Sequence, residues 1–205
     1  EARVLNDVLS LTDNVSSIED FAQNLVSYLR PLLSYDRVMV YRFGDDDHGE
    51  VIAESKVEHL EPFLGMNYPA SDIPRVARRL YVLNRSRIIC NVNSPAVPIV
   101  SANPESCPQS VDLRYALTRA ISPIHIEYLS NMGVTATLTM SLVENDRLWG
   151  MVICHNYEPR YCSVRTRALI NELSRTCSNM VSIVTERENS KRQGLNIDLE
   201  NFMSL

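Results

Sequence analysis

Residues 134–156 read VTATLTMSLVENDRLWGMVICHN and contain the clearest predicted hairpin of the chain. Two extended stretches rich in β-branched and apolar side chains, 134–143 and 147–156, lie on either side of the polar turn Glu144-Asn145-Asp146. A short polar turn between two such stretches is typical of neighbouring antiparallel strands. We therefore expect an antiparallel sheet at the centre of the fold.

A second strand pair lies nearer the start of the chain. Residues 37–43 (RVMVYRF) alternate, and residues 49–57 (GEVIAESKV) follow across an acidic turn, DDDHG. Residues 86–92 predict a further short strand. Two proline-containing stretches without periodicity, 60–72 and 93–110, are expected to be loops.

Helical signals mark five segments, at both ends of the chain and between the strand pairs. They are residues 1–11, the segment after Ser16, 73–83, 122–133 and 163–188. Ser16 and Glu19 match a capping box at the second segment. The residues expected to face inward from that helix are Phe21, Leu25, Leu29 and Leu32.

Proline, serine and glycine mark helix ends. Pro74 is expected in the first turn of its helix, and Ser122 and Pro123 are expected to cap and open the next, which ends at Gly133. The final helix carries an apolar stripe that could pack on the sheet, pair with another copy, or do both. Its members are Ile170, Leu173, Cys177, Met180 and Val184. The pattern predicts an α+β fold, with helices on one face of an antiparallel sheet and loop-built pocket walls on the other.

Composition argues against several classes of protein. The chain has 205 residues, 45% hydrophobic, and a formal net charge of −5, which argues against a broad nucleic-acid surface. We find neither an apolar run long enough for a membrane span nor a secretory signal. The cysteine count is odd and without zinc-type spacing, as expected for reduced thiols in the cytoplasm. We therefore expect a cytoplasmic protein without membrane or nucleic-acid partners. The chain starts with Glu rather than Met, so it could be a fragment of a longer protein.

Residues 68–87 (YPASDIPRVARRLYVLNRSR) place one aspartate, Asp72, between a proline-flanked turn and an arginine-rich helix. Asp72 could simply cap that helix. The arrangement also suits a pocket for a ligand of mixed charge. Lys56 and Lys191 are the chain's only lysines, and an excess of arginine favours sites that grip carboxylates with two hydrogen bonds.

Two histidines are candidates for the same pocket. His125 and Tyr128 lie one turn apart on one face of a predicted helix, and His155 ends an otherwise apolar strand. Taken singly, each histidine is better explained as a core residue. Cys154 and His155 point to opposite faces of a strand and cannot form a nucleophile–base pair. Two histidines without a third ligand make a poor metal site, so we expect neither an enzyme nor a metalloprotein.

Three motifs, taken together, resemble the bilin-binding GAF domain of phytochromes, with bacteriophytochromes the nearest type. They are PASDIP (69–74), SPIHIEYLSNMGV (122–134) and LWGMVICH (148–155), and the likeness covers residues 15–188. The resemblance implies a red/far-red photoreceptor domain that holds a linear tetrapyrrole, with biliverdin the most consistent choice. Light-driven isomerisation of the bilin would signal to an output domain.

The resemblance also implies the division of the chain and its partners. Residues 1–14 would be an N-terminal helix or linker, 15–188 the GAF domain, and 189–205 a linker toward a following domain. The partners would be adjoining PAS-type, PHY-type and output domains of the same protein. Two copies of the chain could also form a homodimer through the final helix.

Roles of single residues follow from their positions in the motifs. Arg87 and Arg119 would bind the two propionates of the bilin, with Thr137, Thr139 and Tyr81 beside them. Either arginine could instead form a surface ion pair.

Other residues would contact the rings. Asp72, its backbone carbonyl and the adjoining Ile73 would lie beside the positively charged pyrrole nitrogens, and His125 would support their hydrogen bonds. His155 would donate to the carbonyl of the terminal ring. Three tyrosines would form the wall around that ring: Tyr41, Tyr68 and Tyr128. A tyrosine on a strand, as Tyr41 is, belongs to the core more often than to a ligand wall.

The chain departs from one family pattern. Plant and cyanobacterial members carry a cysteine that attaches the bilin just before the motif histidine, and here Ile124 and Ile126 flank His125. In bacteriophytochromes the attaching cysteine lies upstream, in an extension before a PAS domain, and that part could have been cut away here. The attachment could instead be noncovalent, with Cys107 a minor candidate for a covalent bond. The alternative function is a pigment-free GAF module for dimerisation, partner binding or another small ligand.

Overall fold

The computed structural model describes residues 2–13, 15–100, 102 and 111–203. These residues form a six-stranded antiparallel sheet with the strand order β3-β2-β1-β6-β5-β4. The strands are β1 (Arg37–Phe43), β2 (Gly49–Lys56), β3 (Asn67–Tyr68), β4 (Ser86–Ile89), β5 (Ala136–Glu144) and β6 (Arg147–Asn156). The predicted α+β fold class with an antiparallel sheet is confirmed.

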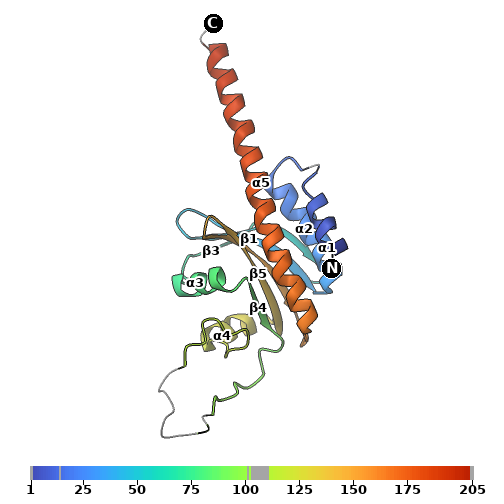
Figure 1. Cartoon of the computed structure of the whole chain (residues 1–205), viewed down its shortest axis with the longest axis vertical. Coiled ribbons are helices and arrows are strands. Elements are labelled where there is room, and N and C mark those ends of the chain that lie inside the picture. Colours follow the sequence, from blue (N-terminus) through green and yellow to red (C-terminus); the bar gives the residue numbers. More distant parts are fainter. Residues whose placement is uncertain (1, 14, 101, 103–110, 204–205) are drawn as a thin grey trace.

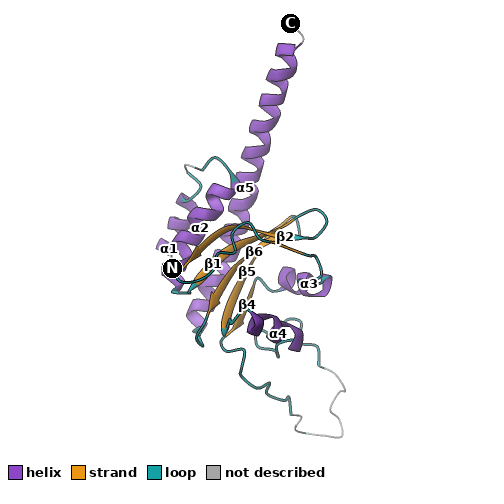
Figure 2. Ribbon diagram, turned by 180° about the vertical axis from the view of Figure 1, so that it is seen from behind, coloured by secondary structure: helices purple, strands orange, loops and turns teal. Residues whose placement is uncertain are grey.

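Helices cover both faces of this sheet (Figures 1 and 2). On one face lie α1 (Ala2–Ser10), α2 (Ile18–Leu33) and α5 (Val164–Met203), and on the other lie α3 (Arg75–Leu83) and α4 (Pro123–Asn131). The prediction of loop-built walls on the second face was therefore incomplete, because two helices contribute to those walls. The second half of α5 projects beyond the sheet (Figure 1).

The predicted hairpin is confirmed as β5 and β6, joined by Asn145 and Asp146. Glu144 pairs with Arg147, and the two turn residues have φ angles of 47° and 58°. Positive φ at both central positions matches the right-handed twist of the flanking strands. Asn and Asp tolerate this conformation better than most side chains do.

Alternation along β5 separates two environments. Leu138, Met140 and Leu142 join the main core, where they pack with α2 and α5. Thr137 and Thr139 are buried on the opposite face. All five apolar-stripe residues predicted on the final helix are buried, which confirms that α5 packs on the sheet.

The helix starts differ from expectation in detail. Ser17, not Ser16, caps α2, and its hydroxyl accepts a hydrogen bond from the Asp20 backbone N–H at 3.1 Å.

The inward face of α2 also differs from expectation near its end. Leu32, expected to face inward, is exposed, and Leu33 is buried instead. The reason is that Leu33, four residues after the buried Leu29, continues the inward stripe.

Other boundaries also moved. Pro74 is the N-cap of α3 rather than a residue of its first turn, and no side chain caps that helix, so the alternative role of Asp72 as a cap is wrong. The strand predicted over 86–92 ends at Ile89. The two-residue strand β3 lies inside a predicted loop, because it is too short to show a period. The final helix continues past Glu188 to Met203.

Candidate functional site

A cavity of about 600 Å³ lies between the sheet face that carries Thr137 and Thr139 and the segments that contain α3 and α4. This volume is within the usual range of small-molecule sites, about 300–1,000 Å³. All twelve residues predicted for the site line this one cavity. They are Tyr41, Tyr68, Asp72, Ile73, Tyr81, Arg87, Arg119, His125, Tyr128, Thr137, Thr139 and His155.

Two guanidinium groups form a basic side of the cavity. Arg87, on β4, donates from Nη2 to the backbone carbonyl of Arg119 at 3.0 Å, and Arg119 donates from Nη1 to the carbonyl of Ala116 at 3.0 Å. Burial and the nearby Arg119 charge lower the pKa of Arg87. Within the described ranges, neither guanidinium has a carboxylate partner. Two partly buried cations favour an anionic ligand, ideally one with two carboxylates.

Hydroxyl groups lie beside this basic side. Strand register places Thr139 opposite Arg87 and Thr137 opposite His155. The threonines are buried, and burial raises the pKa of the nearby Tyr81 hydroxyl. These side chains offer donors and acceptors to a bound polar group without adding charge.

His155, on strand β6, lines the cavity from the sheet side. It is 4% exposed, and its Nδ1 atom has no hydrogen-bond partner among the described residues. Burial, with help from Arg37 and His125, lowers the pKa of His155 to about 3. The imidazole is therefore neutral at physiological pH. An unpaired buried nitrogen in a cavity wall is a feature that a ligand can satisfy.

His125 lines the cavity from α4. Its ring stacks near Tyr128, with centroids 6.4 Å apart and planes 10° apart, as expected from their one-turn spacing. Burial lowers the pKa of His125, and the charge of Arg87 adds to this effect. The cavity thus contains two neutral histidines, each able to donate one hydrogen bond and accept another.

Aromatic rings form another side of the cavity. Tyr41 lies 6.0 Å from Tyr68 and 5.2 Å from Phe43, measured between ring centroids. Gly49 makes this packing possible, because a Cβ atom there would lie 1.8 Å from the Tyr41 ring. Burial raises the pKa of both Tyr41 and Tyr128 to about 12, so both phenols remain protonated.

Asp72 lies at the exposed mouth of the cavity, in the turn before α3. Its backbone N–H donates to the Pro69 carbonyl at 3.0 Å, which closes the proline-flanked turn. The carboxylate contributes to the raised pKa values of Tyr41 and Tyr128, which places negative charge near both phenols. Ile73 follows it into the cavity wall.

Sequence reasoning missed most of the apolar floor. Met39, Met151 and Ile153 line the cavity. A signal was available, since Met39 shares a strand face with Tyr41, and Ile153 shares one with His155. The buried ion pair between Arg37 and Glu54, beside this floor, was also missed because its two members are far apart in sequence.

The thiols and remaining histidines lie elsewhere. Cys154 packs in the main core, on the opposite side from His155, as predicted. Cys107 lies outside the described residues. Ile124 lines the cavity at the position where plant and cyanobacterial relatives were expected to carry a cysteine. None of the described cysteines lines the cavity. In the described part of the chain no cluster of His, Cys, Asp and Glu suits a metal ion, and no helix could span a membrane.

Comparison with known proteins identifies this architecture. The family model for the GAF domain matches residues 17–181. The chain is a GAF domain of the phytochrome type. It is 43% identical to a bacteriophytochrome of Pseudomonas aeruginosa over 182 residues, which cover 88% of this chain and 24% of that protein. It is 39% identical to cyanobacterial phytochrome A of Nostoc sp. over 191 residues, which cover 93% of this chain and 24% of that protein.

Solved structures agree with the sequence relatives. The GAF domain superposes on the chromophore-binding domain of an unusual bacteriophytochrome from R. palustris with a TM-score of 0.83 and 31% identity, covering 91% of this chain and 63% of that one. The chromophore-binding domain of a Stigmatella aurantiaca bacteriophytochrome (a Thr289His mutant in the Pr state) gives a TM-score of 0.82 and 36% identity, covering 88% and 59%. In the sequence comparison, this GAF domain spans about a quarter of the length of the two curated relatives, 24% of each.

Proposed function

We propose that this GAF domain is the pigment-binding part of a red/far-red photoreceptor, and that its pigment is a linear tetrapyrrole, biliverdin in the first instance. One observation carries the proposal: a single cavity joins two guanidiniums and a buried histidine nitrogen, none of which has a carboxylate or hydrogen-bonding side-chain partner among the described residues, with a group of tyrosines. A bilin has two propionates, polar ring nitrogens and carbonyls, and an apolar conjugated body, so each kind of group has a partner.

Different residues would bind different groups of the bilin. Arg87 and Arg119 would hold the propionates, and Thr137 and Thr139 would add hydrogen bonds to them. His155 would donate to a ring carbonyl from its neutral form. A bound bilin supplies light-driven isomerisation of a methine double bond.

The protein's own part in signalling is to respond to a changed ligand shape. Tyr41, Tyr68 and Tyr128 line the same cavity, so a change in the shape of the ligand can alter their packing. The Asp72 carboxylate, exposed and without an ion pair among the described residues, can exchange hydrogen-bond partners. Such local changes can bias the adjoining domains of a longer protein.

The test is an absorbance spectrum of the purified chain mixed with biliverdin, recorded before and after red light. We expect a sharp red band that changes on illumination. A spectrum identical to that of free biliverdin would contradict the proposal and favour the pigment-free module. A denaturing gel stained for zinc–bilin fluorescence tests attachment, and we expect no fluorescent band because no described thiol lines the cavity.

A further inference from the structure

A buried ion pair lies beside the tyrosine side of the cavity, on strands β1 and β2. The side chains of Arg37 and Glu54 are 1% and 4% exposed, and Arg37 Nη1 donates to Glu54 Oε1. Arg37 lies directly opposite His155 in the β1–β6 register, and Glu54 lies opposite Met39. Both charged groups therefore belong to the sheet face that forms the cavity floor.

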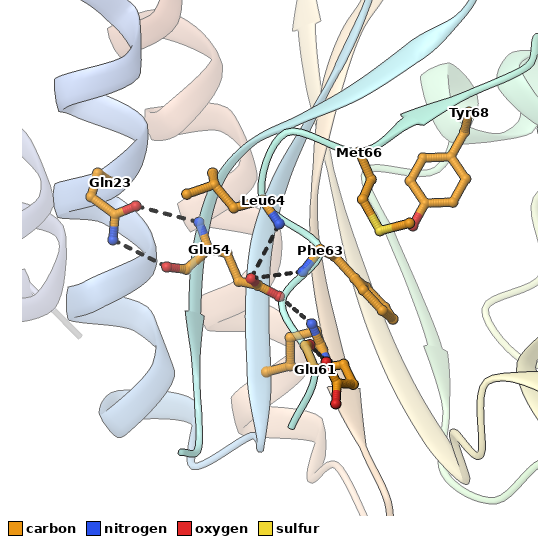
Figure 3. A network of polar contacts seen from close by, with 8 residues as sticks. Gln23, Glu54, Glu61, Phe63, Leu64, Met66 and Tyr68 are labelled. Atoms are coloured by element: carbon orange, nitrogen blue, oxygen red, sulfur yellow. Dashed lines mark hydrogen bonds and ion pairs between the residues drawn. The ribbon is translucent and has the colours of Figure 1, made fainter. Parts of the chain in front are cut away.

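The other side-chain hydrogen bonds of this pair all go to one loop segment, residues 61–64. Glu54 Oε2 accepts the backbone N–H groups of Phe63 at 2.9 Å and Leu64 at 3.2 Å. Arg37 Nη2 donates to the carbonyl of Glu61 at 2.7 Å. Figure 3 shows Glu54 at the centre of these contacts, with the Phe63 ring turned away from Leu64.

The ring of Phe63 completes the contact. It covers the guanidinium of Arg37, whose central carbon lies 3.8 Å from the ring centroid. Phe63 also lines the cavity, and five residues further along the chain Tyr68 does the same. The charged pair thus holds the start of a segment whose side chains form an aromatic wall.

Stability alone is a weak reason for such a pair. Desolvating two charges costs about as much as their attraction returns, and apolar pairs of similar volume are often equally stable. A buried pair with directed hydrogen bonds instead selects one geometry. We propose that Arg37 and Glu54 are positioning residues that fix residues 61–64, and through them the Phe63–Tyr68 wall of the cavity.

The first test needs no pigment and therefore stands apart from the proposed function. Hydrogen exchange is measured by NMR at the amides of Phe63 and Leu64 in the intact chain. We expect clear protection in the wild type, although Leu64 is 55% exposed. In Glu54→Gln we expect exchange at these two amides to speed up at least about tenfold, because the charge-assisted acceptor is lost.

Glu50→Gln is the matched control, because Glu50 lies on the same strand and pairs with Arg42 but contacts neither loop amide. In this control the Phe63 and Leu64 exchange rates should match the wild type. The Thr135 amide, which donates to the Asn156 carbonyl at 2.9 Å and lies outside residues 61–64, is the reference for overall stability, and its rate should match the wild type in every variant. Unprotected Phe63 and Leu64 amides in the wild type would overturn the proposal without any variant. Equal acceleration of Thr135 in Glu54→Gln would also overturn it, since the pair would then act on overall stability.

A second test rests on the proposed function. With biliverdin bound, Glu54→Gln should keep its pigment through Arg87 and Arg119 but show a broader red band and a photoconversion yield at least about twofold lower than Glu50→Gln. An unchanged band and yield would overturn the role in shaping the wall. If the wild type takes up no biliverdin, the proposed function fails, while the exchange test still decides the role of the pair.

Discussion

His155 combines deep burial, a ring nitrogen without a hydrogen-bond partner among the described residues, and a strongly lowered pKa. Burial is the main cause of the lowered pKa, and the charges of Arg37 and His125 add to it. A neutral, preorganised donor is useful to a ligand with carbonyl groups. It also makes the stability of the pigment-free domain depend on pH.

The pH dependence has a defined direction. The folded protein keeps His155 neutral down to a pKa of about 3, while the unfolded chain binds a proton below its ordinary value of 6.5. The unfolded state therefore holds more protons between these values, and stability falls as the pH drops through this window. Between pH 7 and pH 5 the wild type should lose about 2 kcal/mol more unfolding free energy than His155→Gln. Urea denaturation at the two pH values measures this, and equal losses would contradict it.

Arg87 offers a second test at the scale of one residue. Replacing it with Gln removes a partly buried cation, and we expect biliverdin affinity to fall about 10- to 100-fold, as a lost charge-assisted hydrogen bond of about 1.5–3 kcal/mol implies. The exposed Arg79, outside the cavity lining, gives the control Arg79→Gln. Titration with biliverdin and with its dimethyl ester measures the effect. A similar loss of affinity for the ester, which lacks carboxylates, would show that Arg87 does not bind propionate.

At the scale of elements, buried serines connect the cavity helix α3 to the long helix α5. Ser141, on β5, donates from Oγ to the Tyr81 carbonyl at 2.6 Å. The Ser141 carbonyl accepts from Ser174 Oγ, on α5, also at 2.6 Å. Ser178 accepts the Val143 N–H at 3.0 Å. Three elements thus share directed contacts, so displacement of α3 has a short physical route to α5.

Ser174→Ala tests this connection. The variant leaves the buried Ser141 carbonyl without its shortest side-chain donor, and we expect a loss of about 1–3 kcal/mol of unfolding free energy. Ser182→Ala is the control. Among the described residues the Ser182 hydroxyl donates to the Ser178 carbonyl of its own helix alone, at 3.4 Å, and its loss should cost less than about 0.5 kcal/mol of unfolding free energy. Urea denaturation of both variants is the measurement. Equal costs would argue against a specific bond between α5 and β5.

At the scale of the whole molecule, α5 has two parts with different surroundings. Its apolar stripe is buried as far as Val184, whereas residues 189–194 are exposed. The later part projects away from the sheet (Figure 1). An exposed helical extension gains little stability from its own domain, and we predict that in the isolated chain a second copy covers it.

Deleting residues 189–205 tests this division. The unfolding free energy of the remaining chain should change by less than about 0.5 kcal/mol, because the deleted part leaves the core intact. Biliverdin uptake should be unchanged. Light scattering should show a dimer for the whole chain and a monomer after the deletion. A shortened chain that fails to fold would contradict the division, and an unchanged mass would argue against dimerisation through this segment.

Local patterns were sufficient for most elements of the GAF domain. The alternation of β1, β2, β5 and β6, and the end signals of α4, depend on neighbours within a few residues, so they are readable from the chain. Local patterns were insufficient where two neighbouring residues offer nearly equal caps, as Ser16 and Ser17 do, and only the structure shows that the Ser17 hydroxyl accepts the Asp20 N–H.

The sequence by itself determined the α+β class, the sheet hairpins and twelve of the residues that line the cavity, because each is encoded in local periodicity or in motifs of a known family. The roles of those residues toward a bilin stay predictions. The tertiary structure alone decided that Arg37 and Glu54 are buried together, that Ser141 meets Ser174, and that Met39 and Met151 form the floor. Such contacts join residues that are distant in the chain, and only sheet register and helix packing bring them within reach.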